Sequence, residues 1–321
     1  MEYLRDAASG HDLPQGGVVC IGNFDGVHRG HQEILRGAAA RARELGSPSV
    51  VLTFDPHPEK VLRPDSQIRL LSTRAQRAQL VERLGIDALV ELTFDRRLAA
   101  TPAVTFAVEI LHRRLRPREV WLGHDFRFGE GRAGDADLLS VLGLDLGFGV
   151  VPVPAVMDGA EPVSSTRVRR EVARGHVAEA WKLLGRPFFV DGRVAVGRRM
   201  GRTLGFPTIN IEVENELMPA HGVYVTGVHI PSFGPVFGSV TNIGVRPTVY
   251  ERSNVVIECH VLDFTSDVYR EEVRLFFYKR LRDERVFASS MELVAQIRRD
   301  VEAARLYFLQ HGLAEAEVVR R

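Results

Sequence analysis

The hydrophobic pattern divides the chain into two unlike halves. In the first half, short apolar runs alternate with longer segments whose apolar residues recur about every 3.6 positions. The short runs predict strands at 18–21, 49–54, 88–92, 119–122 and 149–153. The longer segments predict helices at 32–45, 74–84, 102–115 and 135–144. Because alternating strands and helices require crossover connections, we expect a mostly parallel sheet with helices on both faces.

Period-2 alternation dominates the second half. The change comes at Gly185-Arg186-Pro187, where glycine and proline interrupt the last helical pattern. Strand-like runs follow at 189–196, 222–229, 236–243, 254–263 and 272–278. Short strands with turns between them predict an antiparallel barrel or sandwich. A last helix is expected after Ser289, which forms a capping-box pattern with Glu292. We therefore expect two domains, 1–184 and 185–321.

Composition is typical of a soluble globular protein. Of 321 residues, 45% are hydrophobic and 26% are charged, and the formal net charge of +1 gives no global field for nucleic acid or an anionic membrane. Cys20 and Cys259 each lie in an apolar run, which favours core packing in a reducing compartment and leaves a disulfide open. The start of the chain lacks a signal-peptide core, and the most apolar long segment, 138–157, is interrupted by Asp145 and two prolines. We expect a cytoplasmic protein without membrane or nucleic-acid partners; no pattern predicts its oligomeric state.

The stretch Gly22-Asn23-Phe24-Asp25-Gly26-Val27-His28-Arg29-Gly30-His31 is the strongest candidate for chemistry. It follows a predicted strand and opens a predicted helix, so free N–H groups and the positive end of the helix dipole meet there and favour an anion. His28 and His31 are three residues apart, on one helix face, and Gly30 leaves room beside the backbone. Each feature alone is common in turns and cores; together they indicate a phosphate site.

Three other polar stretches follow predicted strands: 53–58, 123–129 and 164–167. Parallel sheets bind ligands at the carboxyl ends of their strands, so we expect one active-site edge. The histidines can donate hydrogen bonds to phosphate oxygens, as can the hydroxyls and the guanidinium of Ser164-Ser165-Thr166-Arg167. Asp25 fits best as a cap, with turn former and metal ligand left open. For Phe54, Phe126 and Phe128 the pattern favours core or cleft wall over stacking on a flat ring.

Two features of the second half are candidates for a separate site. The stretch 197–210 carries three glycines, three arginines and a Thr-x-Asn ending, so Thr208 and Asn210 could offer oxygens to Mg²⁺; a basic surface loop is an equal alternative. Alternation places Glu258 on the same face as Val256 and His260. A carboxylate among apolar neighbours is either paired or catalytic, and from the residues alone a salt bridge is favoured.

The motif at 22–31 resembles the His-x-Gly-His nucleotidyltransferases, and in its longer form the bacterial bifunctional riboflavin kinase/FAD synthetases. The second half resembles riboflavin kinase domains in four motifs, at 201–210, 222–224, 242–248 and 258–264. The resemblance implies a Rossmann-like nucleotidyltransferase domain of α/β class, followed by a six-stranded antiparallel β-barrel with a terminal helix. Departures are Val196, Ile209 and Arg270, where His, Ala and Gly are frequent in the family.

The resemblance also implies substrates and roles. Riboflavin, FMN and ATP would be substrates, with Mg²⁺ as cofactor. His28 and His31 would stabilise ATP phosphates and leaving pyrophosphate, Glu258 would take the proton from the ribityl 5′-hydroxyl, and Thr208 and Asn210 would hold Mg²⁺. The expected ATP and phosphate contacts are Gly22, Phe24, Gly30, Asp125, Ser164, Thr166, Arg167, Gly201, Arg202 and Gly205. The expected flavin contacts are Phe54, His57, Pro58, Phe128, Arg282, Glu284 and Phe287.

Two other functions fit parts of the sequence. One is a single adenylyltransferase acting on a coenzyme A or NAD precursor, but such an enzyme does not need a second half with its own Thr-x-Asn and glutamate. The other is a flavin-binding regulator with one inactive site. The presence of Thr208, Asn210 and Glu258 argues against it.

Overall fold

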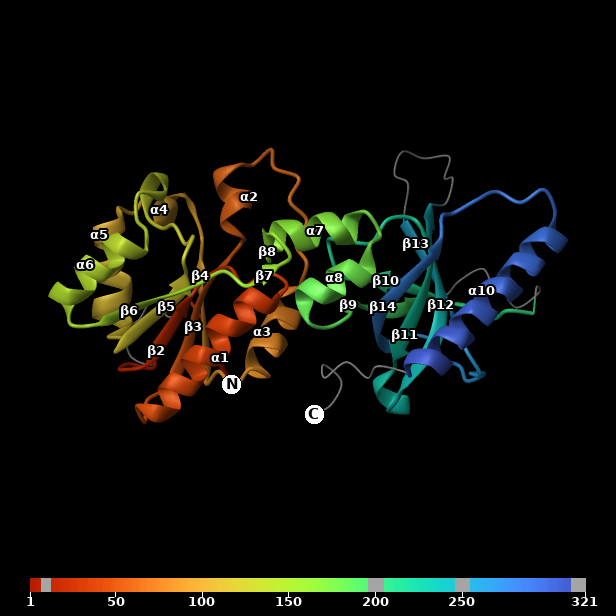
Figure 1. Cartoon of the computed structure of the whole chain (residues 1–321), viewed down its shortest axis with the longest axis horizontal. Helices are drawn as coiled ribbons and strands as arrows, with labels where there is room; N and C mark the ends of the chain where they lie inside the picture. Colours follow the sequence, from red (N-terminus) through yellow and green to blue (C-terminus); the bar gives the residue numbers. More distant parts are fainter. Residues whose placement is uncertain (7–12, 196–204, 246–254, 313–321) are drawn as a thin grey trace. The chain divides into compact units, whose positions relative to one another are not determined.

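The computed structural model describes residues 1–6, 13–195, 205–245 and 255–312. Contacts within the chain divide it into two compact units. The first unit holds residues 1–69 and 74–165, and the second holds 70–73 and 166–321. Figure 1 shows the elements of each unit. The domain boundary at 184/185 stays a prediction.

The first unit contains a six-stranded sheet in which every neighbouring pair is parallel. The strands are numbered along the chain, and their order across the sheet is β1-β4-β3-β2-β5-β6. Their bounds are β1 Glu2–Arg5, β2 Val18–Ile21, β3 Ser49–Asp55, β4 Ala88–Thr93, β5 Glu119–Gly123 and β6 Gly149–Val153. The five predicted strands are confirmed to within a residue or two. β1 was not predicted, because its four residues contain no apolar run.

Helices cover both faces of this sheet (Figure 1). The helices of this unit are α1 Arg29–Glu44, α2 Pro58–Leu62, α3 Arg74–Glu82, α4 Arg96–Ala99, α5 Ala103–Thr105 and α6 Ala136–Leu146, together with the π-helix η1 Phe106–Leu115 and the 3₁₀ turn η2 Glu130–Arg132. A small hairpin is formed by β7 Met157–Asp158 and β8 Glu161–Pro162. The four predicted helices are confirmed, although the third continues from α5 as a π-helix. α2 and α4 are too short to show a helical period.

Strand alternation sends apolar side chains to both faces of the sheet. On one face Ile21, Leu52, Val90 and Leu122 join a core cluster with η1 and α6. On the other face α1 packs closely, because its Gly37 rests on Trp121, where a Cβ would lie 2.5 Å from the indole ring. Burial on both faces explains why the strands are continuous apolar runs.

The second unit opens with two helices, α7 Ser165–Ala173, whose first residue belongs to the first unit, and α8 Val177–Leu184. A closed antiparallel barrel follows, with neighbours in the order β10-β13-β12-β11-β14-β9. Its strands are β9 Phe188–Ala195, β10 Ile209–Val213, β11 Gly222–His229, β12 Val236–Val245, β13 Val255–Val261 and β14 Glu272–Arg282, with η3 Pro231–Phe233 between β11 and β12. The six-stranded barrel implied by the resemblance is confirmed. Alternation alone missed β10, whose first two residues, Ile209 and Asn210, belong to the candidate stretch 197–210.

Helix α10 Ser290–His311 ends the described chain. Ser289 caps it by accepting the Glu292 N–H, as predicted, while the Glu292 carboxylate accepts the N–H of Ala288. Two ion pairs tie α10 to the barrel: Arg282 with the buried Asp300, and Arg305 with Asp263. A hydrogen bond from Arg305 holds the pKa of Asp263 below its usual value. These contacts fix the segment 282–287 that leads from β14 into the helix.

Candidate active sites

The motif loop 22–31 lies at the switch point of the parallel sheet. From β2 the chain builds outward through β3 and β4, then crosses back to place β5 on the other side of β2. Ligands bind in such sheets outside the carboxyl ends of the strands at this reversal. The stretches 22–31, 53–58 and 123–129 directly follow or end β2, β3 and β5, which are neighbours. The expectation of a shared edge for these three stretches is therefore confirmed.

The two histidines form a stacked pair at the start of α1. His28 is the N-cap residue, and its Nδ1 accepts the backbone N–H of His31 at 3.3 Å. Because Nδ1 accepts, the proton of a neutral His28 ring is on Nε2. The ring centroids lie 3.6 Å apart at an interplanar angle of 19°, and Phe24 meets His31 edge-on at 5.2 Å.

The backbone of this loop is strained and held by side chains. Phe24 and Val27 adopt φ values of +49° and +40°, which non-glycine residues rarely take. The side-chain amide of Gln32 donates to Val27 O at 2.9 Å, and the Ser165 hydroxyl donates to Asp25 O at 2.9 Å. Strain of this kind persists only where the surroundings fix it, and it is concentrated at functional sites.

Gly30 lies in a space that admits no side chain without adjustment. A Cβ there would approach the His28 ring to 3.2 Å and Val163 O to 3.7 Å. The segment 163–165 therefore runs beside the motif, which places Ser164 next to it. Thr166 and Arg167 follow in the first turn of α7, within the second unit.

The other expected ligand contacts of the first half lie near the same edge. Gly22 is the first residue of the loop, and a Cβ there would touch the Phe24 ring. Asp125 is exposed just beyond β5. His57 caps α2 by accepting the Glu59 N–H at 3.2 Å, and Pro58 is the first residue of that helix. Phe54 and Phe128 pack in the core on either side of Phe106. Flavin contact by these residues stays a prediction.

In the barrel, three polar side chains form a row across neighbouring strands. Glu258 on β13 is directly opposite Asn210 on β10 and opposite Asn242 on β12. Directly opposite residues share a face. On β13 the alternate residues Ile257, Cys259 and Val261 are buried, whereas Val256, Glu258 and His260 are partly exposed. The predicted shared face of these last three is confirmed, and the row lies on the outside of the barrel.

Asn242 was missing from our candidate contacts. It begins the motif at 242–248, but nothing local marks it as part of a site. What brings it to the site is its register opposite Glu258, which depends on the pairing of β12 with β13.

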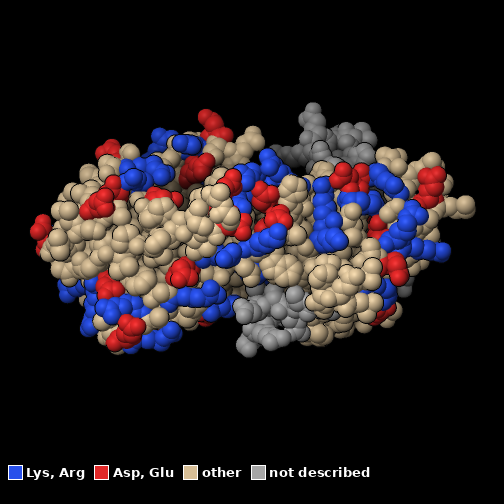
Figure 2. Space-filling view, viewed as in Figure 1, with Lys and Arg blue, Asp and Glu red and all other residues tan. Residues whose placement is uncertain are grey.

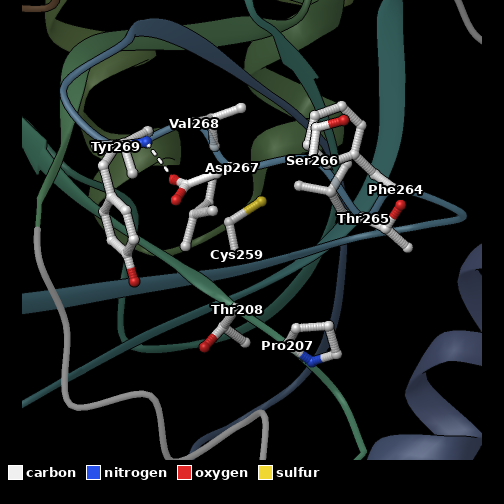
Figure 3. Close-up of a pocket in the computed structure, with 12 residues that line it drawn as sticks. Pro207, Thr208, Cys259, Phe264, Thr265, Ser266, Asp267, Val268 and Tyr269 are labelled. Carbon is white, nitrogen blue, oxygen red and sulfur yellow. Dashed lines mark hydrogen bonds between the residues drawn. The ribbon is translucent and has the colours of Figure 1, made fainter.

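A pocket of about 260 Å³ lies on the other face of these strands, where Ile209, Cys259 and Val261 line it (Figure 3). Pro207, Thr208 and Cys259 lie on one side of it, and the loop from Phe264 to Tyr269 lies on the other (Figure 3). His260 fixes the Thr-x-Asn segment, because its Nδ1 hydrogen bonds to Pro207 O at 2.8 Å while its ring meets Phe206 edge-on. The pocket thus opens beside the hydroxyl of Thr208.

The segment after β14 places a carboxylate close to the row. An ideal Cβ on Gly244 would lie 2.2 Å from Glu284 Oε1, so Glu284 lies across the glycine, and the same Cβ would be 3.3 Å from Asn242 Nδ2. Asp300 grips Arg282 at 2.8 and 3.0 Å, and the guanidinium lies 5.7 Å from the Phe287 ring.

Two glycines and an arginine of the Thr-x-Asn motif remain. Gly201 and Arg202 lie outside the described residues. Gly205 has φ +82° in a turn before Phe206, a conformation that favours glycine.

The donor set suits a hard cation that is bound largely by its substrate. A hydroxyl, two amides and one carboxylate are oxygen ligands of low total charge, which fits Mg²⁺ shared with nucleotide phosphates. Among the described residues, no three His, Cys, Asp or Glu side chains gather to hold a metal ion by themselves. On the face seen in Figure 2, acidic and basic side chains are interspersed, in keeping with the net charge of +1.

Comparisons with known proteins cover both halves. The family model described as FAD synthetase matches residues 11–167, and the one described as riboflavin kinase matches 184–308. The bifunctional riboflavin kinase/FMN adenylyltransferase of Escherichia coli K12 is 38% identical over 96% of this chain and 98% of its own length. The protein of that name from Pseudomonas fluorescens is 41% identical over 95% and 97%.

A solved structure agrees along nearly the whole length. It is described as a macrolide-efflux protein of Streptococcus pneumoniae, with 31% identity, a TM-score of 0.86, and coverage of 95% of this chain and 99% of that one. The efflux named in that description concerns the Streptococcus pneumoniae protein alone. In the described part of the chain, no helix is both long and apolar enough to cross a bilayer.

Proposed function

The chain belongs to the family of bifunctional riboflavin kinase/FMN adenylyltransferases, and we propose which of its residues carry each activity. It phosphorylates riboflavin with ATP to give FMN, and it transfers AMP from a second ATP to FMN to give FAD and pyrophosphate. The observation that carries the assignment of residues is the separation of two oxygen- and nitrogen-rich sites: the histidine pair at the sheet edge and the row Asn210, Glu258 and Asn242 on the barrel.

Glu258 is the general base of the kinase step. Its carboxylate accepts the proton of the ribityl 5′-hydroxyl as the oxygen attacks the γ-phosphorus of ATP, and ADP leaves. The opposite residues Asn210 and Asn242 flank it and offer amide groups to the phosphoryl oxygens or the hydroxyl. Phosphoryl transfer needs mainly positioning and charge neutralisation, which a fixed strand register provides.

ATP and Mg²⁺ belong beside Thr208. The pocket between Thr208 and the loop 264–269 takes the nucleoside, and the phosphates extend past Thr208. Thr208 and Asn210 would hold Mg²⁺, which supplies positive charge to the phosphates. Glu284, Arg282 and Phe287 line one side of the flavin site. The ion pair with Asp300 keeps Arg282 in place.

The histidine pair serves the second step. The FMN phosphate attacks the α-phosphorus of ATP and pyrophosphate leaves, so negative charge moves onto the departing oxygens. His28 donates through Nε2, His31 donates beside it, and the positive end of the α1 dipole lies at the same place. Within the first unit, Ser164 and Asp125 complete the nucleotide contacts. No covalent enzyme intermediate is needed.

Single substitutions test this division. Glu258→Gln should lower FMN formation by about 10²- to 10⁴-fold, the usual contribution of a general base, and leave FMN adenylylation intact. His28→Ala should do the reverse. Glu272→Gln is the control, because Glu272 is an exposed carboxylate outside the row, paired with Arg193 on the neighbouring strand. If Glu258→Gln kept wild-type FMN formation, or if His28→Ala stopped both steps with the fold intact, the assignment would fail.

The dependence on Mg²⁺ and the protein's location in the cell are part of the same proposal. We expect both steps to stop when a chelator removes Mg²⁺ and to recover when it is restored. Cys20 and Cys259 are buried and unpaired, which supports work in the reducing cytoplasm.

A further inference from the structure

The strained loop 22–28 needs a device that holds it in its conformation. Val27 is β-branched and adopts φ +40°, and Phe24 adopts +49°; both side chains are about 1% exposed. A β-branched residue in the left-handed region is a genuine outlier, and it persists only when its surroundings over-determine it. The loop also sets where the histidine pair stands, because His28 ends it.

The carbonyl of Asn23, just before Phe24, receives two side-chain donors. Thr53 Oγ1 lies 3.3 Å from Asn23 O, and Arg77 Nη1 lies 3.4 Å from it. Thr53 is on β3 and Arg77 is on α3, so the two donors reach the loop from different elements. Both residues are buried, with exposed fractions of 0% and 5%.

A buried glutamate fixes the direction of Arg77. Arg77 Nη2 bonds to Glu91 Oε2 at 2.7 Å, and Glu91 on β4 is 1% exposed. Glu91 is also bound by Arg74 and by the Tyr3 hydroxyl. In the sheet register Glu91 is directly opposite Thr53, so the glutamate and the threonine present their side chains on the same face toward one corner of the loop.

A buried ion pair is weak evidence for stability. The cost of taking two charges out of water is often larger than their attraction, and apolar residues of similar size commonly do as well. Fixing one geometry is a better-supported reason for such a pair. Here the geometry that it fixes is a single carbonyl in the loop that carries the histidines.

We propose that Arg77, oriented by Glu91, and Thr53 are positioning residues for adenylyl transfer. They act through Asn23 O on the loop conformation and so on the placement of His28 and His31. The inference rests on the proposed function of the histidine pair. Thr53 opens the polar stretch 53–58 singled out in the sequence, where it had no role of its own, and Arg77 belongs to no motif.

Two variants remove one donor each. Thr53→Val keeps the shape and removes the hydroxyl, and Arg77→Met keeps the length and removes the guanidinium. Arg77→Lys keeps a charge for Glu91, but its single ammonium lacks the fork that reaches Asn23 O at the same time. Ser49→Ala is the matched control, because Ser49 is a buried hydroxyl on the same strand that bonds to Asp87 at 2.7 Å, at the end away from the loop.

The assay measures kcat and KM for FMN adenylylation, with FMN formation by the same preparation as an internal control. We expect kcat to fall about tenfold in Thr53→Val and about 100-fold in Arg77→Met, since a misplacement of about 1 Å can cost that much. KM for FMN, the kinase rate and Ser49→Ala should be near wild type, and Arg77→Lys should not restore kcat. A purely structural role would lower the melting temperature and leave kcat unchanged at temperatures where the protein is folded.

The outcomes separate this inference from the proposal beneath it. If Thr53→Val and every folded Arg77 variant keep the wild-type kcat while His28→Ala is inactive, the positioning role is wrong and the histidine assignment stands. If His28→Ala itself keeps full FAD formation, the histidine assignment fails. Restoration of kcat by Arg77→Lys would show that charge alone matters and would overturn the role of the fork. If Arg77→Met does not fold, Thr53→Val decides.

Discussion

Gly244→Ala separates the kinase site from the fold with a single methyl group. The glycine is on β12, between Asn242 and the end of the strand, and its φ is not positive, so alanine fits the backbone. Its Cβ would lie 2.2 Å from Glu284 Oε1 and 3.0 Å from the carboxyl carbon, whereas ordinary contacts begin at 3.4 Å. The carboxylate must therefore retreat by about 1.2 Å. Glu284 is exposed, so this movement costs little stability.

The expected effect is on riboflavin phosphorylation alone. A displacement of about 1 Å of a substrate-positioning group costs up to about 100-fold, so we expect kcat/KM for riboflavin to fall by about 10- to 100-fold. Stability should hold or rise by about 0.4–1 kcal/mol, because alanine restricts the unfolded chain. FMN adenylylation, assayed in the same preparation, should be unchanged.

A double-mutant cycle makes the test strict. If the methyl group acts by displacing the carboxylate, Gly244→Ala should have no further effect on kcat/KM in a Glu284→Ala background. A wild-type kcat/KM in Gly244→Ala would refute the reasoning. So would an equal additional loss in the Glu284→Ala background, since the methyl group would then act on something other than the carboxylate.

Three other predictions concern single positions. Burial raises the pKa of both the Cys20 and the Cys259 thiols, so an aromatic disulfide reagent should react with neither in the folded protein and with both in denaturant; rapid reaction of either before unfolding would contradict their burial. Arg270 adopts φ +69°, so Arg270→Gly should stabilise the barrel by about 1 kcal/mol, measured by calorimetry, and a loss of stability would contradict the strain. His260→Phe removes the hydrogen bond that fixes the segment before Thr208, so the KM for ATP in the kinase step should rise several-fold; an unchanged KM would show that the segment holds itself.

The order of strands and helices could be predicted from the sequence, because burial leaves a periodic pattern of apolar residues. Strands β2 and β3 are continuous apolar runs since both faces of the sheet are covered there, and β13 alternates since one of its faces is solvated. Strand β1 carries only Leu4 as a partly buried aliphatic residue, and its place is set by pairing with β4 rather than by its own pattern. β10 was missed because five residues beside a glycine-rich stretch show too little alternation.

Among the site residues too, those marked by a local pattern were predicted and those placed by distant contacts were not. The histidine motif was found because its residues are adjacent in the chain, and Thr208, Asn210 and Glu258 because they belong to short motifs. The departure at Arg270 also proved informative, since the structure places it where glycine is favoured. Asn242 begins a motif that the sequence showed, but its place beside Glu258 depends on a strand register, and the contact of Arg77 with Asn23 O spans 54 residues and leaves no local trace.

The most direct test of two separate sites is a mixing experiment. Glu258→Gln and His28→Ala are each incubated with riboflavin, ATP and Mg²⁺, alone and together, and the flavins are separated by chromatography over time. We predict no FAD from either variant alone, accumulation of FMN with His28→Ala, and FAD from the mixture as free FMN passes between molecules. FAD formed from riboflavin by either variant alone, or none from the mixture when both variants are folded, would contradict the account.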